Sequence, residues 1–114
     1  MDDCIFCKII SKSIPAEIVY EDDLCLAFKD INPTAPVHLL IVPKTHIESI
    51  MDIDESNIND ISHILKIIPI LAKKFDINNN GFRIINNCGI DAGQTVKHIH
   101  FHLLGGRKFG WPAG

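Results

Sequence analysis

Three histidines near the C-terminal end of the chain alternate with apolar residues, in the stretch His98-Ile99-His100-Phe101-His102. Because successive side chains of a β-strand point to opposite faces, this spacing predicts three imidazoles on one face and apolar anchors on the other. Two kinds of chemistry fit such a cluster: a metal site with imidazole ligands, or a nucleophile supported by acid–base groups. Residues two apart on a strand are separated by about 6 to 7 Å, so the spacing alone leaves both interpretations open.

A segment of small and polar residues, Asp91-Ala92-Gly93-Gln94-Thr95, comes directly before the histidines. Glycine flexibility, exposed N–H groups and polar side chains are what an oxyanion or phosphate requires. An anion facing a neutral imidazole is typical of phosphoryl transfer. On its own, such a stretch is more often an ordinary turn.

The elements that must position these residues follow from the hydropathy pattern. Short runs rich in Val, Ile, Leu and aromatic residues, bounded by turn residues, predict strands. They cover residues 17–20, 24–30, 39–43, 82–86 and 98–104. A short helical stretch is expected within residues 5–14, before Pro15. Strands, one long helix and further strands predict an α+β domain with an antiparallel sheet.

The long helix is predicted to start near Asp54, because apolar residues then recur at steps of three and four. The face predicted to be buried consists of Ile58, Ile61, Leu65, Ile68, Ala72 and Phe75. Asp52 or Asp54 can accept hydrogen bonds from the free N–H groups at the start of the helix, and Lys73 and Lys74 suit its end. Pro69 lacks an N–H, so we expect a kink there.

The composition limits the class of protein. The chain has 114 residues, of which 46% are hydrophobic and 22% charged, so we expect residues 1–114 to form a single folded domain. A net charge of -3 disfavours general nucleic-acid binding. No signal peptide or membrane span is evident, and the four cysteines suit thiols or metal ligands in a reducing compartment. We therefore expect a cytoplasmic protein, with the nucleus as an alternative.

Several motifs together resemble the histidine-triad (HIT) superfamily. The stretch from His98 to Leu104 is similar to the superfamily's alternating motif. The C-terminal Gly105-Gly106-Arg107 and Trp111-Pro112-Ala113-Gly114 resemble its Hint branch, the histidine-triad nucleotide-binding proteins once described as protein kinase C inhibitors. So do the motifs Ile14-Pro15-Ala16, Phe28-Lys29-Asp30-Ile31-Asn32-Pro33, Ala35-Pro36-Val37-His38 and Val42-Pro43-Lys44-Thr45-His46-Ile47.

This resemblance implies a homodimer whose five-stranded sheets join, and a purine nucleoside phosphoramidase that releases AMP or GMP from an amine. By position, His100 would be the nucleophile, and His102 with the backbone at Gly93 and Gln94 would hold the α-phosphate. Other positions carry over in the same way: Thr95 would supply a hydroxyl near the leaving amine, Asp30 would bind the ribose, Ile31 would line the base pocket, Asn87 would contact the sugar–phosphate, and His38 would support the triad.

Cys4 and Cys7 have the spacing at which two thiolates bind one zinc ion, and a closed site needs two further ligands from distant sequence. The candidates are His46 and His98, as in histidine-triad relatives that carry this cysteine pair. Since other members lack the cysteines and are active, any zinc here would be structural and no catalytic cofactor is expected. The alternative is two reduced, partly buried thiols.

Three other functions remain open at this point. A dinucleoside polyphosphate hydrolase could use the same triad but would need room for a second nucleotide. A nucleotide-binding regulatory module could engage partner proteins with little turnover. A small zinc-dependent structural domain would need the cysteine site alone.

Overall fold

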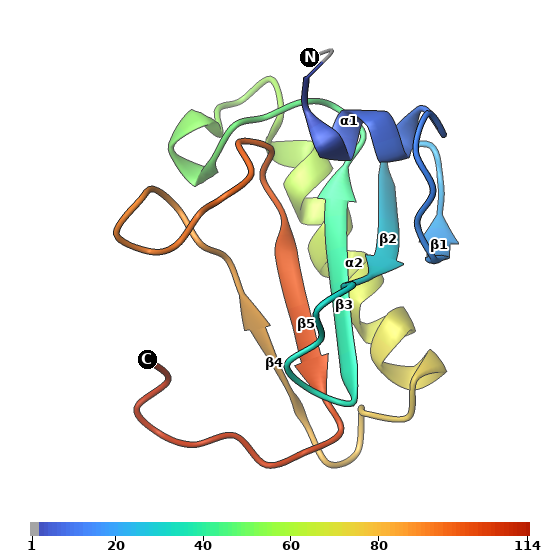
Figure 1. Ribbon diagram of the computed structural model, residues 1–114, viewed down its shortest axis with the longest axis vertical. Helices are drawn as coiled ribbons and strands as arrows, with labels where there is room; N and C mark the ends of the chain where they lie inside the picture. The colour runs from blue at the N-terminus through green and yellow to red at the C-terminus, as the bar shows by residue number, and fades with distance from the viewer. Residues whose placement is uncertain (1–2) are drawn as a thin grey trace.

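The computed structural model describes residues 3–114 and contains one five-stranded antiparallel sheet with a helix on each face (Figure 1). The strands are β1 (Ile18–Glu21), β2 (Cys25–Lys29), β3 (Val37–Pro43), β4 (Phe82–Ile85) and β5 (Phe101–Gly105), in the spatial order β1-β2-β3-β5-β4. The helices are α1 (Ile5–Ile10), a short 3-10 helix η1 (Ile50–Asp52) and α2 (Ile58–Lys74). The α+β class and the five-stranded antiparallel sheet predicted from the sequence are confirmed.

β5 is shorter at its start than the sequence predicts. It begins at Phe101, which pairs with Ile41 of β3, whereas a strand from His98 was expected. Residues 98–100 instead run beside the chain that follows β3. There the Ile99 N–H donates to the Ile47 carbonyl at 2.6 Å. Regular pairing stops there because Pro43, the last residue of β3, has no N–H to donate.

The α2 face of the sheet holds the larger hydrophobic core. Helix α2 lies against β2 and β3 and runs behind the sheet in Figure 1. Its buried side chains are Ile61, Ile64, Ile67, Ile68, Leu71 and Ala72. The predicted buried face was therefore partly wrong, because Ile58 and Leu65 are 44% and 52% exposed. Both the predicted and the observed sets satisfy steps of three and four, so periodicity alone could not choose the face.

The start of α2 also differs from the prediction. Its N-cap residue is Asn57, whose side chain makes no capping hydrogen bond to the helix. The Asp54 carboxylate accepts from the N–H and the hydroxyl of Ser56, so it shapes the turn before the helix. Helix α2 continues through the exposed Pro69, as a proline on the solvent side can be accommodated more easily than one in the core. None of the helices formed by residues 3–114 is both long and apolar enough to cross a membrane.

The opposite face of the sheet carries the second hydrophobic cluster and the histidines. Alternation along β2 sends Cys25 and Ala27 toward α2 and sends Leu26 and Phe28 to this second face. Helix α1 covers part of it by burying Phe6 and Ile9. The face that carries the histidines is therefore lined by apolar side chains and closed at one end by α1.

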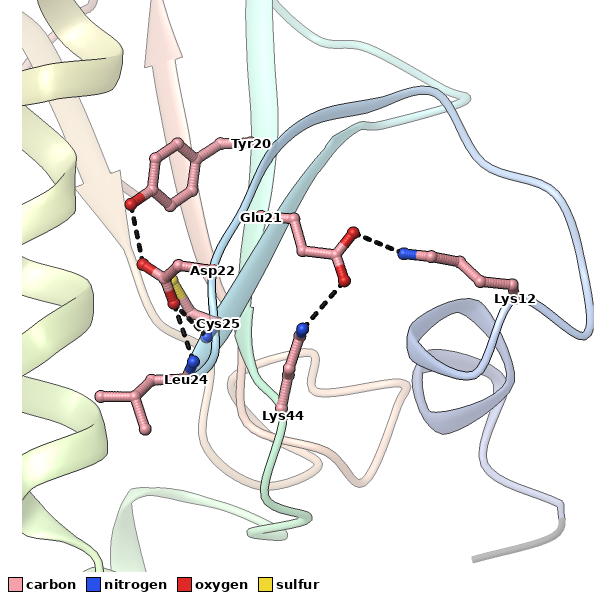
Figure 2. A network of polar contacts seen from close by, with 7 residues as sticks. All are labelled: Lys12, Tyr20, Glu21, Asp22, Leu24, Cys25 and Lys44. Atoms are coloured by element: carbon pink, nitrogen blue, oxygen red, sulfur yellow. Dashed lines mark hydrogen bonds and ion pairs between the residues drawn. The ribbon is translucent and has the colours of Figure 1, made fainter.

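A polar network holds the turn between β1 and β2 (Figure 2). One carboxylate oxygen of Asp22 accepts from the backbone N–H groups of Leu24 and Cys25 at 2.8 and 2.9 Å. The other oxygen accepts from the Tyr20 hydroxyl at 2.7 Å and from His63 of α2 at 2.6 Å. Burial acts to raise the pKa of the Asp22 carboxyl, but these hydrogen bonds together hold it well below its usual range, so the network contains a carboxylate at neutral pH.

Glu21 makes a second, more exposed connection in the same region (Figure 2). Its two oxygens lie 2.6 Å from Lys12 Nζ and 2.8 Å from Lys44 Nζ. Exposed ion pairs of this kind contribute little individually. Here one carboxylate joins the segment after α1 to the residue after β3, which helps keep α1 near the histidine face.

Candidate active site

Two histidines on neighbouring strands and two on the segment leading into β5 form the site. His38 lies on β3 and His102 on β5, where Leu40 is the cross-strand partner of His102. The ring of Phe6 stands edge-on to those of His98 and His100, with centroids 5.9 and 5.0 Å apart. The structure therefore brings all three triad histidines to one face of the sheet.

His100 has its tautomer fixed by the backbone. Its Nδ1 lies 2.8 Å from the carbonyl oxygen of His98, and a carbonyl can only accept, so Nδ1 carries the proton. In the neutral ring Nε2 then keeps a lone pair, and no group among residues 3–114 hydrogen-bonds to it. His100 is 6% exposed, so this free nitrogen belongs to a largely desolvated ring. The arrangement suits a nucleophile.

His102 is held in the opposite tautomer by a chain of three residues. The Thr34 N–H donates to Nδ1 of His38 at 3.1 Å, so His38 carries its proton on Nε2. That N–H faces Nδ1 of His102 at 2.9 Å and the Asp30 carboxylate at 3.3 Å. The neutral His102 ring therefore carries its proton on Nε2 and can donate a hydrogen bond. The site thus pairs one lone-pair nitrogen, on His100, with one N–H donor, on His102.

Burial keeps the His102 and His38 rings neutral by lowering the pKa of each. It lowers the pKa of His102 to about 4, and the nearby imidazoles of His100 and His38 act in the same direction. Burial also lowers the pKa of His38, against the opposing effect of the Asp30 carboxylate. At neutral pH the chain is therefore one of neutral imidazoles, in which the position of each proton determines donor and acceptor.

The loop from β4 to β5 was expected to bind phosphate through its backbone. The Gly93 and Gln94 N–H groups donate to the Ile90 and Gly89 carbonyls at 3.1 and 3.0 Å, so both already hold the loop together. Gly93 has φ of +80°, which favours glycine. The Gln94 side chain accepts from the Gly89 N–H and donates to the Glu48 carbonyl. These contacts shape the loop and tie it to the segment after β3.

Three other predicted residues make no hydrogen bond to the triad among the described residues. The Asn87 amide donates to the Ala92 carbonyl at 2.8 Å, inside the same loop. Thr95 lines a cavity together with Cys4, His46 and neighbouring residues, and no hydrogen bond among the described residues joins it to the histidines. Ile31 is 91% exposed, directly after Asp30. The sequence predicts roles for these residues that depend on a bound substrate.

The four residues expected to bind metal come together beside the triad. Their ligand atoms all lie within 4.8 Å of one another. His98 Nδ1 is 3.5 Å from Cys4 Sγ and 3.6 Å from Cys7 Sγ, and His46 Nδ1 is 3.3 Å from Cys7 Sγ. A tetrahedral zinc ion with ordinary bond lengths separates a sulfur and a nitrogen ligand by about 3.6 Å. The spacing of these atoms therefore fits a metal ion.

The protonation pattern of His98 supports the same interpretation. Its Nε2 lies 2.8 Å from the Pro43 carbonyl, so that nitrogen carries the proton and Nδ1 offers its lone pair to the cysteines. Burial lowers the pKa of His98 to about 4, which keeps the ring neutral as a ligand must be. By contrast, burial and the adjacent Cys4 raise the pKa of the metal-free Cys7 thiol to about 11. These residues can hold a metal ion.

The cluster of Asp22, Cys25 and His63 differs in geometry from this metal cluster. The carboxylate and imidazole are 2.6 Å apart, which is a hydrogen-bond distance and too short for two ligands of one tetrahedral ion. Cys25 is fully buried, and burial raises the pKa of its thiol to about 12. This second group is a hydrogen-bonded network.

Three residues of the site were missed by the sequence analysis. Phe6 packs on two of the histidines, and the Thr34 backbone determines the tautomer of His38. The Asn86 amide donates to the His100 carbonyl at 2.9 Å, while its Oδ1 is buried without a partner among the described residues. Phe6 lies between the two cysteines and could have been noticed in the sequence. Contacts of backbone groups can be made by any residue type, so the sequence does not indicate them.

The fold and site define a class of protein in which an antiparallel sheet carries two adjacent histidines in opposite tautomers. The HIT domain family model matches residues 11–109. The chain belongs to the HIT domain family.

Two relatives and one solved structure show how extensive this similarity is. An uncharacterised HIT-like protein of Synechococcus elongatus is 46% identical over 113 residues, covering 99% of this chain and 98% of its own. A 14 kDa zinc-binding protein of Brassica juncea is 45% identical over 114 residues, covering 98% and 100%. The crystal structure of a HIT family hydrolase from Legionella pneumophila has a TM-score of 0.95 at 46% identity, covering 98% and 100%.

Proposed function

We propose that this protein is a purine nucleoside phosphoramidase of the Hint branch, which hydrolyses the P–N bond of a nucleoside 5′-monophosphate amide. The observation that carries the proposal is the pair of opposite tautomers: a lone pair on His100 Nε2 beside an N–H donor on His102. A nucleophile and an oxyanion donor side by side are what displacement at phosphorus needs.

In the first step His100 Nε2 bonds to phosphorus and the P–N bond breaks. The amine leaves with one proton taken up from solvent water, and Thr95 is the hydroxyl proposed to lie near it. The nucleotidyl imidazole carries a positive charge, which the His98 carbonyl stabilises by accepting from Nδ1–H at 2.8 Å. His102 donates from Nε2 to a phosphate oxygen, where negative charge increases.

In the second step water attacks phosphorus, the P–N bond to His100 breaks, and the nucleoside monophosphate leaves. Water loses one proton, which balances the proton taken up by the amine, and His100 returns to its neutral tautomer. Asp30 is proposed to accept from the ribose hydroxyls, Ile31 to cover the base, and Asn87 with the Gly93–Gln94 turn to border the phosphate. The exposed side chain of Ile31 is free to pack on a planar base.

The activity is tested with adenosine 5′-phosphoramidate and, in parallel, diadenosine polyphosphates. The wild type should release AMP from the first substrate much faster than from the others, and His100→Ala should release none. His63→Ala is the matched control, since His63 lies on α2 and bonds to Asp22 rather than to the triad. Tight nucleotide binding without turnover would favour a regulatory module instead.

We also propose a structural zinc ion held by Cys4, Cys7, His46 and His98. The distances fit tetrahedral coordination, and a relative of this chain is named as a zinc-binding protein. Zinc would supply a fixed connection between α1 and the segment leading into β5, with no role in the chemical step. Reduced thiols also fit a cytoplasmic location.

Metal analysis of protein purified without chelators tests this site. The wild type is expected to contain close to one zinc per chain. Cys7→Ser should reduce that content strongly, and Cys88→Ser, at a half-buried cysteine outside the cluster, should leave it unchanged. A wild type without zinc would contradict the proposal.

A homodimer with joined sheets is proposed as the functional unit. β4 is an edge strand with exposed Phe82 and Ile84, and Ile58 and Leu65 of α2 are exposed as well. Exposed apolar residues and an open strand edge both suit contact with a second copy of the chain. Sedimentation equilibrium should give twice the chain mass, and a monomer at micromolar concentration would contradict it.

A further inference from the structure

Arg107 connects the C-terminal segment to the loop between β2 and β3. Its guanidinium donates twice to the Thr34 carbonyl, from Nε at 3.2 Å and from Nη2 at 3.0 Å. A third donor, Nη1, reaches the Lys108 carbonyl at 3.2 Å. The Phe109 ring lies 4.3 Å from the guanidinium carbon. Contacts on several sides fix the orientation of this planar group.

The backbone before Arg107 is fitted to the same loop. Gly106 has φ of +92°, and a Cβ at this position would lie 2.8 Å from the Pro36 ring. Only glycine allows the chain to pass Pro36 this closely. The turn after β5 therefore places Arg107 against the loop that contains Thr34.

Thr34 is held from both sides. Its carbonyl accepts from Arg107, and its N–H donates to Nδ1 of His38. That second bond keeps Nδ1 free of a proton, so Nε2–H of His38 donates to His102 Nδ1. The Asp30 carboxylate, 3.3 Å from His38 Nε2, favours the same tautomer. A surface arginine is thus connected to the ring proposed to contact phosphate.

We propose that Arg107 is a positioning residue that selects the tautomers of His38 and His102 by holding Thr34 in place. Without the guanidinium, the Thr34 N–H moves away and His38 gains access to the Nδ1–H tautomer. Its Nε2 lone pair would then face His102 and draw the His102 proton to Nδ1. His102 would lose the Nε2–H donor, and this consequence for turnover rests on the proposed function.

The test uses the full chain labelled with ¹⁵N-histidine, and compares the wild type with Arg107→Met. Methionine keeps an apolar stem over Phe109 but removes every donor. Arg83→Met is the matched control, because Arg83 lies over the same ring at 5.1 Å and donates to the Gly110 carbonyl without touching Thr34. Nitrogen chemical shifts report which ring nitrogen carries the proton.

Wild type and Arg83→Met should show both histidines protonated at Nε2, and Arg107→Met should show a substantial Nδ1-protonated population. The kcat for adenosine 5′-phosphoramidate should fall about threefold to thirtyfold in Arg107→Met, with KM little changed, as Asp30 still supports the favoured tautomer. Wild-type tautomers in a folded Arg107→Met protein would overturn the proposal. If Arg107→Met shows the tautomer change but the wild type does not hydrolyse adenosine 5′-phosphoramidate, the role of Arg107 is upheld and the phosphoramidase proposal is rejected.

Discussion

Replacing Phe6 by alanine tests whether α1 forms a wall of the site. Phe6 is 6% exposed and packs edge-on against Phe28, His98 and His100, at centroid distances of 5.5, 5.9 and 5.0 Å. Phenylalanine truncations in cores cost about 3 to 5 kcal/mol, and a short terminal helix can move into the gap, so we expect about 3 kcal/mol. Urea unfolding measures this loss directly.

Turnover should fall as well, for a reason separate from the loss of stability. Without the edge-on contact of Phe6, the His100 ring can rotate more freely and is more accessible to water. Because the proposed nucleophile is then less well positioned, turnover should slow at least about tenfold. Ile9→Ala is the matched control, since Ile9 is also 6% exposed on α1 but offers no ring to the histidines. It should cost about 2 to 3 kcal/mol and leave turnover within about threefold. Equal losses of turnover in the two variants would refute the argument.

Three further results are expected. Asp22→Asn should lower the free energy of unfolding by about 1.5 to 3 kcal/mol in urea titrations, because an amide cannot accept from all the donors that surround the carboxylate. A loss below about 0.5 kcal/mol would contradict this. Gly105→Ala should lower the free energy of unfolding by about 1 to 3 kcal/mol in thermal unfolding, because a Cβ at this position would lie 2.7 Å from the buried Ile77. An unchanged Tm in this variant would contradict the prediction. Folding lowers the pKa of His102 from 6.5 to about 4, so between these pH values the unfolded chain binds a proton that the folded chain excludes. The free energy of unfolding should therefore fall as the pH decreases from about 6.5 to 4. The slope of this free energy against pH should be smaller in His102→Asn, and equal slopes would refute the prediction.

The parts of the site that depend on residue type were predictable from the sequence. The alternating histidines share one face, as their period of two predicted, and the spacing of Cys4 and Cys7 marked both as metal ligands. Their partners His46 and His98 were expected from the resemblance to the histidine-triad superfamily. The five strands follow the same logic, since runs of Val, Ile, Leu and aromatic residues between turn residues mark each of them. These features depend on local pattern.

The parts that depend on backbone partners could not be predicted. Nothing in the sequence indicates that the Thr34 N–H meets His38 or that the Asn86 amide meets the His100 carbonyl. Likewise, the N–H groups of Gly93 and Gln94 looked free but are used inside their own loop. Which face of α2 is buried was ambiguous because apolar residues also occupy its outer side. In each case tertiary contacts decided between locally equivalent options.

In the proposed mechanism His100 becomes covalently bound to the nucleotide. The most direct measurement is the mass of the protein quenched in acid-free denaturant during turnover of adenosine 5′-phosphoramidate, followed by peptide mapping. We expect an adenylyl adduct on the peptide that contains His100, absent from His100→Ala and present in His63→Ala. Rapid hydrolysis by the wild type with no adduct at any quench time, or full turnover by His100→Ala, would contradict it.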